Sequence, residues 1–183
     1  YMDGTTDITR TYPLGPLTED EKRFYTWTLQ CHIDLAKAVW LDYCECKMID
    51  TIAREPLWRH LINYRCGTGH SVSFVGNVHE GPHALNSRNT TRMHPGMVVT
   101  DEPGVYETDL VGIRIENELV CVHKADNQYG TFLGFEPLMF VPIATSPILP
   151  GVLDKDEIAW LNDYHRQVFA KLAPHLNDEE RSW

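Results

Sequence analysis

Four stretches rich in β-branched and aromatic residues lie in the middle of the chain, and they constrain its fold more than any other feature. Bounded by Gly, Pro or Asn, they predict strands at residues 71–78, 96–105, 111–122 and 135–143. In the third stretch two kinds of side chain fall on opposite faces: Ile113, Ile115, Leu119 and Cys121 on one, and Arg114, Glu116 and Glu118 on the other. Alternation of this kind predicts a strand with one apolar and one polar face.

Helical periodicity flanks these strands. Apolar residues recur at three- and four-residue steps over residues 18–39, and Thr18-Glu19-Asp20-Glu21 predicts a capping box at the start. Further helices are predicted at 48–55, where Pro56 disturbs the continuation, and at 154–172. Helices at both ends of a run of strands predict an α+β fold with a curved antiparallel sheet.

The net charge and the cysteines indicate which binding partners and which cellular location to expect. A chain of 183 residues can bury a single core, and its net charge of -10 repels the phosphates of nucleic acids and acidic membrane surfaces. No apolar run is long enough to span a bilayer, so we expect neither nucleic acid nor membrane as a partner. The cysteines are odd in number and scattered, which favours reduced thiols and a cytoplasmic location. Cys44 and Cys46 could form a soft metal pair, although no second pair follows at a suitable spacing.

A different set of metal-type ligands lies within strand-like or glycine-bounded segments: Asp7, His70, Glu102 and Glu116. Carboxylates and an imidazole without a thiolate suit a divalent ion such as Mn²⁺, Co²⁺ or Zn²⁺, and bridging carboxylates can hold two ions close together. Each residue alone is more often structural, as a turn, a loop or a solvated strand face. From the residues alone, a metal site and a purely structural role stay open for each of them.

The segment His79-Glu80-Gly81-Pro82-His83 also matches the pattern of a zinc-protease helix. That motif requires a continuous helix, on which residues four apart share a face. Gly81 and Pro82 oppose such a helix, because proline lacks the amide donor and clashes with the preceding turn. We therefore reject a zinc site of this type.

Six short motifs, taken together, are similar to a known family. They are Asp3-Gly4-Thr5-Thr6-Asp7-Ile8-Thr9-Arg10-Thr11, Gly67-Thr68-Gly69-His70, Asn77-Val78-His79-Glu80-Gly81-Pro82, Thr100-Asp101-Glu102-Pro103-Gly104, Gly112-Ile113-Arg114-Ile115-Glu116-Asn117 and Phe135-Glu136-Pro137-Leu138. With Trp160-Leu161-Asn162-Asp163-Tyr164-His165 farther on, the chain resembles the Xaa-Pro aminopeptidases, the aminopeptidase P group of the pita-bread metallopeptidases (M24). The resemblance implies a pita-bread fold, with helices on the outer face of the curved antiparallel sheet. It implies a catalytic domain at 1–143 that lacks its first strand, and a C-terminal helical extension at 144–183.

The resemblance also implies a role for each matching residue. Asp7 and Glu116 would bridge two metal ions, and His70 and Glu102 would bind one of them. Glu102 would in addition carry a proton to the leaving nitrogen. His79 would act in catalysis by hydrogen bonding to the substrate or its tetrahedral intermediate.

Two further site residues, and some departures from the family pattern, follow from the same comparison. Arg114 would orient Glu116 during catalysis, and Cys66 stands where the family usually has a histidine that contacts substrate. Ser71 and Ser73 replace the usual glycines. The first metal aspartate of the family would lie upstream of this sequence. We therefore expect an N-terminally truncated catalytic domain with an incomplete second metal site and little activity of its own.

The implied function is a metal-dependent aminopeptidase that releases the N-terminal residue from peptides with proline in second position. Its nucleophile would be a hydroxide held by two divalent ions, for which we expect Mn²⁺, with Zn²⁺ and Co²⁺ as alternatives. The partners would be such peptides and, in the full-length protein, a second copy of the chain. Two other functions stay open: a catalytically impaired binding or scaffold module, and a non-peptidase hydrolase or lyase that uses the same metal centre.

Overall fold

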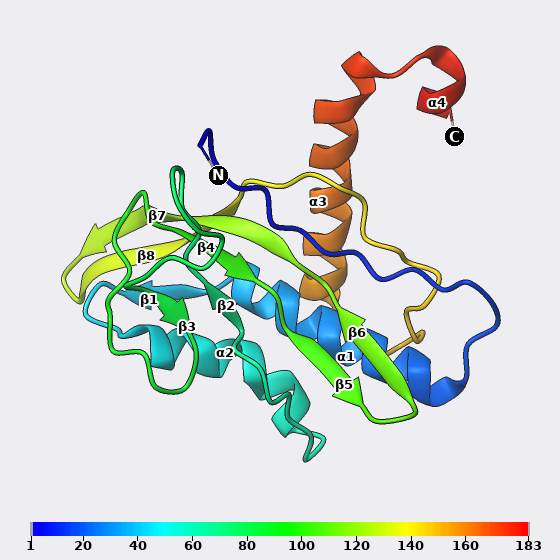
Figure 1. Ribbon diagram of the computed structural model, residues 1–183, viewed down its shortest axis with the longest axis horizontal. Coiled ribbons are helices and arrows are strands. Elements are labelled where there is room, and N and C mark those ends of the chain that lie inside the picture. The colour runs from blue at the N-terminus through cyan, green and yellow to red at the C-terminus, as the bar shows by residue number, and fades with distance from the viewer. Residues whose placement is uncertain (1, 183) are drawn as a thin grey trace.

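The computed structural model describes residues 2–182 (Figure 1). Its helices are α1 (Glu19–Ala36), α2 (Cys46–Trp58), α3 (Lys155–Leu172), the 3₁₀ turn η1 (Ala173–His175) and α4 (Asp178–Ser182). The strands are β1 (Val39–Leu41), β2 (Gly69–His70), β3 (Ala84–Leu85), β4 (Val98–Asp101), β5 (Gly104–Glu107), β6 (Val111–Arg114), β7 (Asn117–Asn127) and β8 (Gly130–Pro137). None of these helices is both long and apolar enough to cross a membrane.

The main sheet is antiparallel, with the strand order β1-β8-β7-β4. Strands β7 and β8 form a long hairpin, and Gly130 begins β8 with a positive φ of 132° that side-chain-bearing residues rarely adopt. The pairs β2–β3 and β5–β6 form two small sheets. Since β4 leads into β5 and β6 into β7, the β5–β6 ribbon continues from one end of the β4–β7 pair (Figure 1). Two short breaks in these strands, at residues 102–103 and 115–116, therefore lie side by side.

Helices α1 and α2 cover one face of the main sheet. Buried Leu35 and Ile49 from these helices share an apolar cluster with Val99, Leu119 and Phe135 from the strands. A second cluster joins α1 and α3 to Ile113 and Ile115. The apolar face of the predicted strand is thus buried against helices, and its polar face is turned to the opposite side of the sheet.

The predicted helices are confirmed, with changes at their ends. Thr18 caps α1 through the predicted capping box with Glu21, but the helix ends at Ala36, and residues predicted as its last turn lead into β1. Helix α2 begins at Cys46 and continues past Pro56 to Trp58. Asp154 caps α3, which ends at Leu172 as predicted.

The predicted strands are confirmed only in part. The strand at 71–78 is wrong: Ser71 forms one isolated bridge with Val99, and the residues after it form bends. Phe74 and Val75 have strand propensity but are exposed, because no neighbouring strand lies beside them to pair with. The stretches at 96–105 and 111–122 each divide into two strands. The last predicted strand is shifted, since β8 begins at Gly130 and ends at Pro137.

Candidate metal centre

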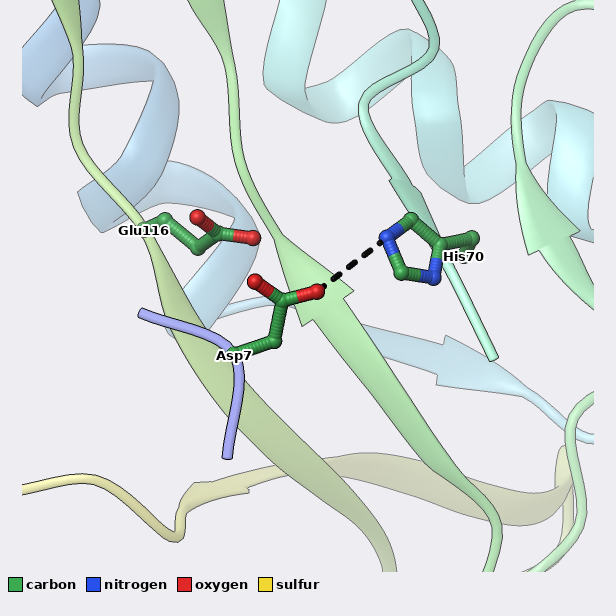
Figure 2. A group of neighbouring side chains, drawn as sticks. All are labelled: Asp7, His70 and Glu116. Atoms are coloured by element: carbon green, nitrogen blue, oxygen red, sulfur yellow. Dashed lines mark ion pairs between the residues drawn. The ribbon is translucent and has the colours of Figure 1, made fainter. Parts of the chain in front are cut away.

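Three of the predicted ligands meet on the polar side of the sheet (Figure 2). One ligand atom from each of Asp7, His70 and Glu116 can be chosen so that all lie within 4.8 Å of one another. Asp7 Oδ2 is 3.6 Å from His70 Nε2, and Figure 2 shows the Glu116 carboxylate turned toward the same space. The residues come from the N-terminal segment, from β2 and from the break before β7, which are far apart in the sequence.

Backbone pairing brings Asp7 to Glu116. Thr9 and Glu116 form an isolated antiparallel bridge, in which the Glu116 amide donates to the Thr9 carbonyl at 3.0 Å. Two residues away on each strand, the Asp7 amide donates to Glu118 Oε1 at 2.8 Å. The N-terminal segment is therefore held beside the start of β7, and the Asp7 side chain is directed at the cluster.

His70 is oriented by its neighbours on β2 and β4. Its amide donates to Thr100 Oγ1 at 2.9 Å, and its ring Nδ1 lies 3.0 Å from the Ser71 carbonyl. The preceding residue must be glycine, because a Cβ on Gly69 would lie 1.8 Å from the Thr100 carbonyl oxygen. When Nδ1–H donates to that carbonyl, Nε2 keeps a free lone pair and faces the carboxylates.

Glu102, the fourth predicted ligand, contacts the same histidine. Its Oε1 lies 3.1 Å from His70 Nε2 and also accepts from Thr100 Oγ1 at 3.1 Å. Although burial opposes ionisation, the hydrogen bond and charge of His70 and the charge of Arg114 lower the pKa of Glu102. Glu102 and Glu116 occupy the two adjacent strand breaks, so all four predicted ligands lie in one site.

The electrostatics of Glu116 suit a cation. Its side chain is 1% exposed, and Oε1 has no hydrogen-bond partner among residues 2–182. Burial, opposed by the Thr9 hydroxyl and reinforced by the charges of Glu102 and Asp7, raises the pKa of Glu116 to about 7. An unpartnered buried carboxylate oxygen beside two more carboxylates and an imidazole is the donor set of a divalent metal ion.

Arg114 and His79 lie at the edge of this cluster. The Arg114 guanidinium is 3.6 Å from Glu102 Oε2, and its Nε donates to the Tyr106 hydroxyl at 2.8 Å. It attracts Glu116 electrostatically and forms no ion pair with it, so its direct carboxylate partner is Glu102 and not the predicted one. The exposed His79 ring lies over His70, with 3.8 Å between the ring centroids.

Cys66 does not join the cluster. Its thiol is half-buried and donates to the Gly104 carbonyl at 3.6 Å, and burial raises the pKa of the thiol. It lines a separate cavity of about 560 Å³ together with Arg54, Arg65 and Arg88. A substrate contact through Cys66 stays a prediction.

Two residues near the site were not assigned from the sequence. Glu118 is 3% exposed and holds the Asp7 amide, while the Thr9 hydroxyl donates to Glu116 Oε2. The strand alternation that placed Glu118 on the same face as Glu116 was the available signal for the first. For Thr9 no local pattern exists, because its partner is distant in the sequence. Glu118 also lines a cavity of about 440 Å³ with Ser71 and Ser73, the two serines that replace glycines.

The two alternative metal sites find no support in residues 2–182. Residues 79–83 are not helical, and His83 Nε2 lies 2.8 Å from the Val98 carbonyl, so the zinc-protease motif is absent as predicted. All five cysteines are free. The described part of the chain contains one group of three or more potential ligands, and no cysteine belongs to it.

Sequence comparison places the chain among known proteins. Residues 1–123 match metallopeptidase family M24, and residues 131–183 match the C-terminal region of peptidase M24. Aminopeptidase P1 of Lotus japonicus is 42% identical over 100% of this chain, which covers 29% of that protein. Aminopeptidase P2 of Arabidopsis thaliana is 44% identical over 96% of the chain and 26% of its own length. The chain thus spans less than a third of these relatives.

Structural comparison agrees. The X-prolyl aminopeptidase of Caenorhabditis elegans, described as a cytosolic enzyme with a di-nuclear active site, superposes with a TM-score of 0.91 and 38% identity, over 99% of this chain and 30% of its own. The prolidase of Pyrococcus furiosus matches 75% of this chain and 38% of its own, with a TM-score of 0.64 and 28% identity. The predicted pita-bread fold is confirmed, and the chain belongs to metallopeptidase family M24, within its aminopeptidase P group.

Proposed function

We propose that this chain is the metal-binding part of an aminopeptidase that releases the N-terminal residue from peptides with proline in second position. The convergence of Asp7, His70, Glu102 and Glu116 at one place, with a buried Glu116 oxygen left unpartnered, is the observation that supports it. The relatives named aminopeptidase P and X-prolyl aminopeptidase support the substrate class.

Asp7, His70, Glu102 and Glu116 would hold the divalent ions. We propose Mn²⁺, because three of the four predicted ligands are carboxylates and only one is an imidazole. When bound, the ions supply a water of lowered pKa and positive charge beside the reacting carbonyl.

The protein side chains then supply positioning and proton transfer. Glu102 has a lowered pKa and is therefore ionised at neutral pH, so it can accept a proton and pass it to the proline nitrogen as the peptide bond breaks. Arg114 holds Glu102 from the side away from His70. His79, exposed and in ring contact with His70, would donate a hydrogen bond to the developing oxyanion of the substrate.

The test is hydrolysis of a peptide with proline in second position, compared with the same peptide carrying alanine there. The protein should cleave only the first, lose activity in a chelator and regain it with Mn²⁺. Equal cleavage of both peptides, or activity that survives the chelator, contradicts the proposal. His79→Ala should lower kcat and leave Mn²⁺ binding unchanged, whereas His94→Ala, which alters an exposed histidine on another segment, should change neither.

The second candidate, a catalytically impaired binding or scaffold module, is favoured by Cys66 and by the serines at 71 and 73. Metal content distinguishes the two, because an enzyme of this type needs two ions per complete site and a module needs none. Cys66→His separates them further: a rise in turnover would show that the cysteine handicaps an otherwise functional site.

The remaining expectations are proposals at the level of the whole protein. We propose a cytoplasmic location, supported by the description of the C. elegans relative as cytosolic. A homodimer, and a division into a catalytic part at 1–143 and a helical extension at 144–183, rest on the resemblance to the aminopeptidase P group.

A further inference from the structure

A second polar cluster lies directly behind the glutamates of the metal centre. Asp101 precedes Glu102 at the end of β4, Asn117 follows Glu116 at the start of β7, and the two are paired across the strands. Because successive side chains of a strand point to opposite faces, Asp101 and Asn117 point away from the metal centre. Both are completely buried, with 0% exposure, on the side covered by α1.

His32 of α1 contacts residues of both β4 and β7. His32 is 0% exposed, and its Nδ1 lies 3.0 Å from Asp101 Oδ2. Its Nε2 is 3.4 Å from the Asn117 amide nitrogen, which places a donor on one side of the ring and an acceptor on the other. The contact with Asp101 is short, although neither Asp101 oxygen receives a well-aligned hydrogen bond. A single rigid ring therefore sets the separation of the residues next to Glu102 and Glu116.

The C-terminal helix reaches the same cluster through Tyr164. Its hydroxyl accepts from Arg10 at 2.8 Å and lies 3.3 Å from Asn117 Oδ1, while the carbonyls of Val141 and Met139 are nearer acceptors for its proton, at 3.0 and 3.1 Å. Arg10 also donates to Asn117 Oδ1 at 2.7 Å and to the Glu116 carbonyl at 2.6 Å. Tyr164 is 1% exposed. A continuous chain of contacts, through the partly buried Arg10, thus runs from α3 to the backbone of Glu116.

Asp101 and Asn117 point to the face opposite the predicted ligands, and His32 and Tyr164 contact them there, so these side chains would not touch an ion. Burying so many polar groups is costly unless each finds a partner, and an apolar core would be at least as stable. Such a network restricts the positions of the strands that it connects. The strands in question carry the two glutamates whose spacing decides whether they can share metal ions.

We propose that His32 and Tyr164 are positioning residues, which set the distance between Glu102 and Glu116 from behind the sheet and make α3 a requirement for metal affinity. The inference rests on the proposed metal-dependent function. It assigns a role to the C-terminal helix beyond stabilising the fold.

The chain offers a matched pair for the test. Tyr25 and Tyr164 share one apolar cluster, are 2% and 1% exposed, and each donates its hydroxyl proton to the protein, but Tyr25 bonds only the Ala144 carbonyl, at 2.7 Å. Both Tyr25→Phe and Tyr164→Phe should lower the urea midpoint of unfolding, and Tyr164→Phe by more, because its hydroxyl also accepts from Arg10. Only Tyr164→Phe should weaken Mn²⁺ binding, by about tenfold in Kd measured by isothermal titration calorimetry.

Two variants of His32 test its positioning role. His32→Leu should raise the Mn²⁺ Kd by about 10- to 100-fold, and His32→Asn should recover part of the loss, because its amide can still donate toward Asp101. An unchanged Kd in Tyr164→Phe, or equal changes in both tyrosine variants, overturns the inference alone. Failure of the unaltered protein to bind Mn²⁺ overturns the proposed function, and the inference with it.

Discussion

Replacing Glu116 by glutamine distinguishes the effect of a buried carboxylate on stability from its effect on metal binding. The substitution keeps the shape of the side chain and removes its charge. In the metal-free protein this should be stabilising, because Glu116 is 1% exposed and one of its oxygens lacks a partner. Burial and the charges of Glu102 and Asp7 disfavour the ionised carboxylate, so removing that charge should raise the free energy of unfolding by about 1–3 kcal/mol.

In the presence of metal, the unaltered protein should be more stable than Glu116→Gln. Loss of residues that only orient ligands costs about 10- to 100-fold in affinity, so loss of a ligand should cost about 100-fold or more. At a Mn²⁺ concentration of about 100 times the Kd of the unaltered protein, binding stabilises it by about 2.7 kcal/mol. A 100-fold weaker variant gains only about 0.4 kcal/mol under the same conditions.

The assay is urea unfolding with and without Mn²⁺, followed by circular dichroism. Glu136→Gln is the control, because Glu136 is an exposed glutamate on β8 and should alter neither value. The reasoning is refuted if Mn²⁺ stabilises Glu116→Gln as much as the unaltered protein, or if the metal-free variant is less stable than its parent.

Two further predictions concern the frame of the site. Gly69→Ala should destabilise the protein by more than about 3 kcal/mol or prevent folding, because the new methyl group would lie 1.8 Å from the Thr100 carbonyl oxygen; a soluble variant with an unchanged urea midpoint would contradict this. His165 accepts a hydrogen bond from the Ile143 amide at 3.1 Å, and burial, aided by the charge of Arg10, lowers its pKa below the unfolded value of 6.5. The unfolded state therefore takes up a proton first as the pH falls, so stability should decrease from about pH 7.5 downward through 6.5, and this decrease should be smaller in His165→Gln than in the unaltered protein. An identical pH dependence of the urea midpoint in the two proteins would exclude His165 as a source.

Some features of the fold depend only on neighbouring residues, and the sequence alone predicted them. The capping residues Thr18 and Asp154 define the starts of α1 and α3 because a cap involves only the next three residues. Strand alternation likewise placed Glu116 and Glu118 together on the face opposite Ile115. The six motifs, read as a resemblance, identified the four residues that the structure brings together.

Tertiary structure decided where strands could pair. Residues 71–78 have strand propensity but pair with β4 only at Ser71, whereas the polar, exposed residues 123–127 form the end of β7 because β8 lies beside them. Propensity records how well a side chain suits a pleated surface, and only a neighbouring strand supplies that surface.

The site shows the same division between local and long-range information. The sequence by itself determined which side chains can bind a divalent ion and, through alternation, which face of a strand they occupy. Only the family resemblance implied that Asp7 lies beside Glu116. Nothing in the sequence showed that Arg114 contacts Glu102, or that His32 and Tyr164 lie behind the glutamates. Those contacts join residues that are distant along the chain, and they exist only once the N-terminal segment pairs with the start of β7 and α1 and α3 pack beneath it.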